Sequence, residues 1–250
     1  MADITLEVIA CSVDDCRAVQ EGGGDRIELC SALELGGLTP SLGLLIAARQ
    51  AVRLPIMAML RPRPGGFCYS EAEFAVLLAD ADLALRYGAD GLVFGCLHAG
   101  GTVDAERTAA VVQLAGDRQT VFHRAFDVTP DPFAALDALV RLGVTRLLSS
   151  GRQPSALAGA ANLAAYRAHV GERLQILPGS GITPANVAEV LRRTGCDQVH
   201  ASLSGRVEDR STAANGAIRF TPAALGPQEQ VRVTDRDLVT AMRRELAGLM

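Results

Sequence analysis

Short runs of β-branched and aliphatic residues recur along the whole chain, and each is followed by a stretch with helix signals. They predict eight strands, over residues 4–10, 26–30, 55–60, 91–97, 120–124, 145–149, 174–178 and 198–202. The strand midpoints lie about 28 residues apart, which is the length of one strand–helix unit. Eight such units in 250 residues favour a closed (β/α)8 TIM barrel, as a single domain over residues 1–250, over an open doubly wound sheet.

Helix boundaries in the sequence fit the same alternation. Ser70 with Glu73 has the pattern of a capping box at the start of a helix, and Thr234 with Asp237 predicts the start of the last one. Between strand eight and that helix, residues 203–233 are rich in Gly, Ala, Arg and Thr and have no clear period. A connection of this length is usually a functional or a disordered loop. Because it follows a barrel strand, we expect it to lie over the face where barrel active sites are built.

The composition excludes several classes of function. All 24 basic residues are arginine, so no lysine is available for a Schiff base or for a P-loop. The net charge of −4, without a basic cluster, argues against nucleic acid as a partner. No stretch reaches the roughly 18 consecutive apolar residues of a membrane span. Six scattered cysteines without a Cys-x-x-Cys pair are typical of reduced thiols, and we therefore expect a cytoplasmic protein.

Two carboxylates lie inside otherwise apolar strands. Glu7 and Glu28 would each cost several kcal/mol if they were buried without a partner. One interpretation is a salt-bridge network with Arg61 and Arg124 that stabilises a barrel without catalytic function. The other makes one carboxylate a general base, with a pKa set by burial and by neighbouring charge. In both cases the pair should lie near the catalytic face of the barrel.

Histidines follow strands five and eight. With the two glutamates, His123 and His200 have the chemistry of a zinc, manganese or iron site, although no His-x-His or His-Glu-x-x-His spacing supports a metal. The alternatives are acid–base catalysis or substrate binding by His123, and histidines with a purely structural role. If the barrel transfers protons, the candidates are Glu7, Glu28, His123, Asp127 and His200.

Arginines and glycines at strand ends predict an anion site. Arg61 and Arg63 are two residues apart, so on an extended strand end they would point the same way, and Arg124 adds a third guanidinium. Such a group favours a carboxylate or a phosphate. The turn after strand seven supplies three more candidates, which are Gly179, Ser180 and Gly181. Barrels commonly bind phosphate with backbone N–H groups at that turn, although a tight turn needs glycine even without a ligand.

Cysteines give a weaker signal for a metal. Cys11 and Cys30 come from neighbouring strand ends and could meet. A soft metal such as Cu(I) needs two thiolates, or a thiolate and a thioether, within reach. No Cys-x-x-Cys or Met-x-x-Met spacing is present, so spacing alone does not predict copper.

Several of these residues belong to runs that are highly specific in combination. The runs are residues 24–30 (Gly-Asp-Arg-Ile-Glu-Leu-Cys), 34–41, 61–63 with Phe67 and Tyr69, 122–127 (Phe-His-Arg-Ala-Phe-Asp), 150–151 and 179–183. With them the chain resembles the CutC copper homeostasis family from about residue 6 to residue 235. The resemblance implies a (β/α)8 barrel, a cytoplasmic location, a homo-oligomer (dimer or tetramer) and a role in copper handling, with Cu(I) bound by cysteine in some members.

The sequence departs from the family pattern at two positions. Members with a Glu-Val-Cys motif on strand one have cysteine where this chain has Ile9. The two-cysteine copper site of those members therefore carries over through Cys30 alone, with Cys11 as the candidate replacement. Gly66 stands where an aspartate is usual, so no role of that aspartate carries over.

Three hypotheses about function follow. The first is a copper homeostasis protein that binds Cu(I) through Cys30 and Cys11. The second is an enzyme acting on a small anionic metabolite, phosphorylated or carboxylated, which the arginines and the 179–181 turn hold while Glu28 and His123 exchange protons. The third is a non-catalytic barrel in which the polar set is a structural network.

Overall fold

Eight parallel strands form a nearly closed barrel in the computed structural model, which describes residues 4–220 and 226–249. The strands are β1 (Thr5–Ala10), β2 (Arg26–Leu29), β3 (Ile56–Met59), β4 (Gly91–Phe94), β5 (Gln119–Phe122), β6 (Arg146–Ser149), β7 (Gln175–Pro178) and β8 (Gln198–Ala201). They pair in the order β7-β6-β5-β4-β3-β2-β1-β8, and a parallel bridge between Gly179 and His200 joins β7 to β8. The predicted TIM barrel is confirmed.

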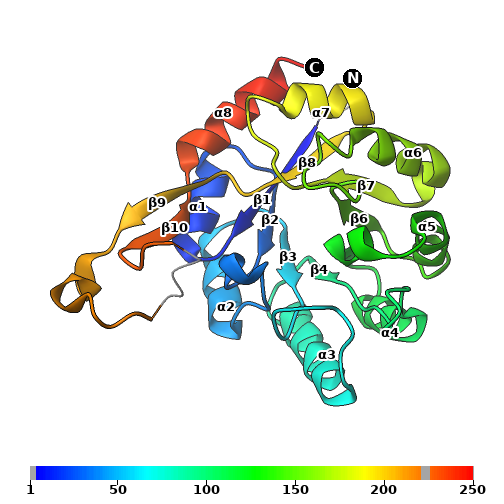
Figure 1. The fold of residues 1–250 in the computed structure, drawn as a ribbon, viewed down its shortest axis with the longest axis horizontal. Coiled ribbons are helices and arrows are strands. Elements are labelled where there is room, and N and C mark those ends of the chain that lie inside the picture. The colour runs from blue at the N-terminus through cyan, green and yellow to red at the C-terminus, as the bar shows by residue number, and fades with distance from the viewer. Residues whose placement is uncertain (1–3, 221–225, 250) are drawn as a thin grey trace.

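Helices alternate with these strands and lie around the outside of the barrel (Figure 1). They are α1 (Val13–Glu21), α2 (Leu42–Ala51), α3 (Glu71–Arg86), α4 (Ala105–Ala115), α5 (Pro132–Arg141), α6 (Ala160–Val170), α7 (Val187–Thr194) and α8 (Arg236–Ala247). The capping box of Ser70 and Glu73 is present at the start of α3. The expected cap of the last helix is wrong, because Asp235 rather than Thr234 accepts the first N–H groups of α8. In the described part of the chain, every helix is too short or too polar to cross a membrane.

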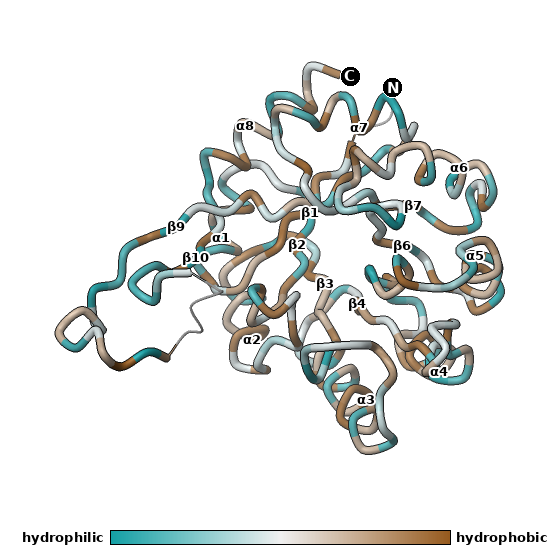
Figure 2. The backbone as a smooth tube through the Cα atoms, viewed as in Figure 1, coloured by the Kyte–Doolittle hydropathy of each residue, from teal (hydrophilic) through white to brown (hydrophobic). Residues whose placement is uncertain are grey.

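The pleat of the strands sorts their side chains between two cores. Leu6, Val8 and Ala10 of β1 belong to the large outer core against the helices, whereas Ile9 packs on the smaller core inside the barrel. Because side chains alternate along a strand, Glu7 also faces inward. Figure 2 shows hydrophobic residues along the central strands and mixed colours on the outer helices. The inner core occupies the barrel at the level where the strands end, and it forms the floor of the site.

The connection from β8 to α8 contains a two-stranded antiparallel hairpin that projects from the barrel (Figure 1). Its strands are β9 (Ser204–Glu208) and β10 (Gln230–Thr234). The prediction of a loop without regular structure over 203–233 is therefore wrong at both ends. Val207 and Val231 form an exposed cross-strand pair on the hairpin. Val231 and Val233 alternate with polar residues in β10, but this strand pattern covers only five residues.

Candidate functional site

A cavity of about 460 Å³ opens at the carboxyl ends of the strands. Its apolar walls include Ile9, Met59, Leu148 and Ile182. Seven of the residues singled out in the sequence line it, namely Glu28, Arg61, His123, Arg124, Ser180, Gly181 and His200. Glu7, Asp127, Arg63, Gly179, Cys11 and Cys30 do not line this cavity. A second cavity, of about 630 Å³, lies beside it under the β9–β10 hairpin.

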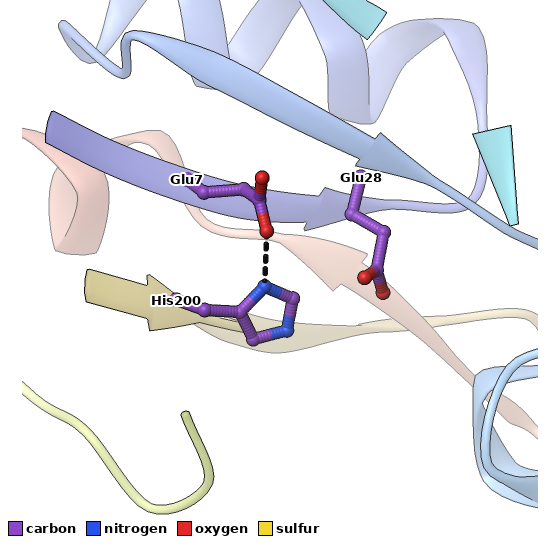
Figure 3. Close-up of side chains that lie close together, drawn as sticks. All are labelled: Glu7, Glu28 and His200. Atoms are coloured by element: carbon purple, nitrogen blue, oxygen red, sulfur yellow. Dashed lines mark hydrogen bonds and ion pairs between the residues drawn. The ribbon is translucent and has the colours of Figure 1, made fainter. Parts of the chain in front are cut away.

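Glu7 lies completely buried beneath the cavity, between two cationic partners. Its carboxylate accepts a hydrogen bond from Arg26 Nε at 2.5 Å. It accepts a second one from His200 Nδ1 at 2.8 Å (Figure 3). Burial opposes ionisation of this carboxyl, but Arg26 and His200 outweigh it and lower the pKa of Glu7 to about 2. The prediction that Arg61 and Arg124 pair with Glu7 is wrong. The partner is Arg26, which enters the barrel interior from the neighbouring strand β2.

Glu28 and His200 face each other at the edge of the cavity (Figure 3). Glu28 is 3% exposed and its Oε2 has no hydrogen-bond partner. Burial raises the pKa of Glu28 to about 7. Burial disfavours the imidazolium of His200, yet the carboxylates of Glu28 and Glu7 raise its pKa. Both side chains therefore have raised pKa values at the edge of the cavity, which is typical of groups with an acid–base role.

Ligand atoms of Glu7, Glu28 and His200 lie within 4.8 Å of one another, which is compact enough for a metal ion. However, both oxygens of Glu7 are already bonded, one to Arg26 and the other to the Nδ1 atom of His200. Only two residues, Glu28 and His200 through its Nε2 atom, keep a free donor, and a catalytic metal usually takes three protein ligands. His123 does not belong to the group. These residues do not fit a metal centre.

His123 lines the cavity with a neutral imidazole ring. Its Nδ1 accepts from the backbone N–H of Ala125 at 3.2 Å, so the proton of the neutral ring lies on Nε2, and Nε2 is buried without a partner. Burial and the charge of Arg61 lower the pKa of His123 to about 3, which keeps the ring neutral. Gly95 makes room for it, because a Cβ there would lie 2.4 Å from the His123 Cε1 atom.

Arg61 carries a buried positive charge without a carboxylate. The side chain donates to the carbonyl groups of Leu35, Gly37 and Gly65 and stacks over the ring of Phe67, and its Nε has no partner. Within residues 4–220 and 226–249 it forms no ion pair. A guanidinium in this situation favours an anionic ligand.

Arg63 turns away from the cavity and binds Glu73 through Nε at 2.5 Å. The expectation that Arg61 and Arg63 point the same way is wrong. The alternation of a strand no longer applies to them, since β3 ends at Met59 and the backbone bends over residues 62–65. Arg63 therefore supports the start of α3, where Glu73 closes the capping box.

Asp127 connects two strand ends. Its carboxylate accepts hydrogen bonds from the hydroxyl groups of Ser149 and Ser150, from the backbone N–H of Arg152 and from Arg124 Nε. With its acceptor positions filled in this way, Asp127 fixes the loops that follow β5 and β6. Arg124 is half-exposed at the mouth of the cavity, with its guanidinium between Asp127 and Ser150.

The turn after β7 has an unusual backbone. Ser180 adopts φ 84° and Gly181 φ 68°, and Leu203 after β8 has φ 42°. A non-glycine residue in this region is strained, and such strain gathers at functional sites. Gly179 allows close packing, because a Cβ there would lie 2.5 Å from a Leu148 methyl group. Ser180 and Gly181 border the cavity, as an anion site would require.

Cys11 and Cys30 meet at the strand ends, with 3.5 Å between their Sγ atoms. Cys30 is fully buried in the inner core, while Cys11 is partly exposed and lines the second cavity. The hydrogen bond between the thiols lowers the pKa of Cys11 and, together with burial, raises that of Cys30. Met59 packs in the same core. Two sulfurs, with a thioether nearby, form a soft donor set in an apolar surrounding.

Three comparisons with known proteins agree on the family. A model of the CutC family matches residues 4–205. The chain is 44% identical over 246 residues to a CutC family protein of Treponema denticola, covering 98% of this chain and 100% of the relative. It is 38% identical over 230 residues to the human copper homeostasis protein cutC homolog, covering 92% of this chain and 84% of the relative. A crystal structure of a CutC copper homeostasis protein from Streptococcus agalactiae matches with TM-score 0.76 and 30% identity, covering 80% of this chain and 98% of that one. The chain belongs to the CutC family.

Proposed function

We propose that this protein is an enzyme that binds a small anionic metabolite in the cavity at the carboxyl end of the barrel. The observation that carries the proposal is Arg61, a buried guanidinium on the cavity wall without a carboxylate partner among the residues that the structure describes. A buried charge is costly unless it is paired, and the carbonyl groups that it contacts supply only partial charges. A phosphate or carboxylate at Arg61 Nε, bordered by the strained Ser180–Gly181 turn, would complete the pairing.

Proton-transfer groups surround the same space, which favours an enzyme over a storage or carrier protein. Glu28 has a pKa of about 7, His200 is held by Glu7, and His123 offers an N–H group. Groups with strongly shifted pKa values in a barrel mouth are typical of acid–base catalysis. The arginines can only bind and stabilise charge, since they stay protonated.

Anion binding can be tested by thermal unfolding and calorimetric titration with inorganic phosphate and 2-phosphoglycolate. We expect both to raise the melting temperature of the wild-type protein, and Arg61→Gln to abolish the increase. Arg63→Gln is the matched control, because Arg63 lies outside the cavity and binds Glu73. An unchanged increase in Arg61→Gln would overturn the proposal and leave the polar set with a structural role.

A second candidate function is Cu(I) binding by Cys11 and Cys30, favoured by the 3.5 Å separation of their sulfurs. The second cavity gives an incoming ion access to Cys11. Copper would then be the cargo of the protein, which is consistent with the name of the human relative, a copper homeostasis protein homolog. Titration of the reduced protein with Cu(I) against a competing chelator should show one bound ion per chain. The double variant with Cys11→Ser and Cys30→Ser should lose this binding. The exposed Cys68 provides the control Cys68→Ser, and equal affinity in the double variant would exclude this site.

A further inference from the structure

Within residues 4–220 and 226–249, three buried polar atoms without a hydrogen-bond partner belong to side chains that line the first cavity. They are Glu28 Oε2 on β2, Arg61 Nε two residues after β3, and His123 Nε2 directly after β5. A polar atom that is buried and unpaired destabilises the fold. A single ligand that reached these atoms from the cavity would complete all three.

The three atoms specify the polarity of that ligand. Arg61 and the neutral His123 can only donate at these atoms, so they require an oxygen with electron density to share. Glu28 as a carboxylate can only accept, so it requires a proton on the ligand. Met59 and Leu148 form an apolar wall of the cavity, which suits a short carbon chain between the polar groups of the ligand.

We propose that the cavity catalyses proton abstraction from a carbon next to a carbonyl group, in a small anionic α-hydroxycarbonyl compound, with Glu28 as base and His123 as the donor to the carbonyl oxygen. This inference rests on the proposed function, since the anionic group is what Arg61 holds. A carboxylate base combined with a neutral imidazole is also the arrangement of triosephosphate isomerase.

The step balances without an added reactant. Glu28 takes the proton of the C–H bond, and the electron pair of that bond forms the carbon–carbon double bond of an enediolate. The carbonyl π electrons move to the oxygen, where the His123 N–H group and the Arg61 charge stabilise them. Return of the proton from Glu28 to the neighbouring carbon gives the isomer, so nothing is oxidised or reduced overall.

His200 has a place in the same step. Its Nδ1 is held by Glu7 at 2.8 Å, which leaves Nε2 on the side of the ring that faces Glu28 (Figure 3). This nitrogen can move the hydroxyl proton between the two oxygens of the enediolate. Glu28 cannot do this at the same moment, because it holds the proton taken from carbon. Glu7 is then a positioning residue that fixes the ring.

The test is hydrogen exchange in D2O, followed by proton NMR, with dihydroxyacetone phosphate, glyceraldehyde 3-phosphate and hydroxypyruvate as probes. We expect the protein to replace the C–H proton next to the carbonyl of at least one probe by deuterium. Glu28→Gln should reduce the rate by about 10²–10⁴-fold, the usual contribution of a general base, while 2-phosphoglycolate still raises the melting temperature. Glu34→Gln is the control, because this carboxylate lines the second cavity only.

The outcomes separate the two proposals. If 2-phosphoglycolate binds in an Arg61-dependent manner and no probe exchanges above the rate of Glu28→Gln, the enolisation chemistry is refuted and the anion site stands. If neither binding nor exchange is found, both proposals fail. Exchange that persists in Glu28→Gln but is lost in His200→Gln would overturn the assignment of the base.

Discussion

The two buried glutamates of the barrel should respond to the same substitution with opposite signs. Glu7→Gln removes a carboxylate that Arg26 and His200 hold, and its folded-state pKa is lowered from 4.5 to about 2. Because the unfolded chain binds the proton more tightly, the Glu7 charge stabilises the fold above pH 4.5, and this contribution disappears as the pH falls through 2. A shift of this size corresponds to a loss on the order of 3 kcal/mol at pH 8 for Glu7→Gln, or roughly 6–12 °C in melting temperature.

Glu28 has the reverse linkage, since its pKa is raised from 4.5 to about 7. Its folded form holds the proton more tightly, so its contribution is fully present below pH 4.5 and declines as the pH rises through 7. Glu28→Gln should therefore stabilise the protein at pH 8, by up to about 3 kcal/mol, and leave it unchanged at pH 4. Urea unfolding of both variants at the two pH values measures this. Equal destabilisation by both substitutions at pH 8 would refute the reasoning, because it would mean that both carboxylates are paired.

Further predictions concern other parts of the barrel. Gly95→Ala should displace His123 and lower the affinity for 2-phosphoglycolate in calorimetric titration, because the added Cβ would overlap the ring. In a thiol assay, Cys68 should react first and Cys30 only on unfolding, since burial and a raised pKa keep Cys30 protonated. The exposed valine pair of the β9–β10 hairpin should pack in the expected homo-oligomer, so serine at both positions should lower the sedimentation coefficient.

The alternation of side chains along the strands predicts part of the site as well as the fold. Inward-facing residues follow every second position, so Glu7 and Ile9 on β1 share a face, as do Arg26 and Glu28 on β2. Arg26 lies two residues before Glu28 on the same face of β2, so the alternation predicts that its cation points into the barrel, as Glu7 does. Arg26 stands at the first position of β2, far from the strand ends where the other candidate cations Arg61 and Arg124 were expected.

Other features of the site depend on the residue at which each strand ends, and the pattern of hydrophobic and polar residues does not determine that residue. The divergence of Arg61 and Arg63 follows from the end of β3 at Met59, two residues before Arg61. The approach of the Cys11 and Cys30 sulfurs depends on the register of β1 and β2, which pairs Ala10 with Leu29. The sequence therefore predicted seven of the side chains that line the cavity, but not which of them find partners there.

The structural network and the ligand site are not alternatives, because they occupy different levels of the same barrel. At the lower level, Glu7 joins Arg26 and His200, and Arg26 also donates to Gln198 at 3.0 Å. Burial lowers the pKa of Arg146, a further inward-facing cation, to about 10, so it remains charged at neutral pH. The barrel interior thus contains the guanidinium groups of Arg26, Arg61 and Arg146, against the carboxyls of Glu7 and Glu28. Glu28 is half protonated near pH 7, so the charges of this group sum to an excess of positive charge that surrounding water cannot screen well. We expect an anion bound at Arg61 to compensate this excess and to favour the protonated states of Glu28 and His200, so that ligand binding would be coupled to proton uptake.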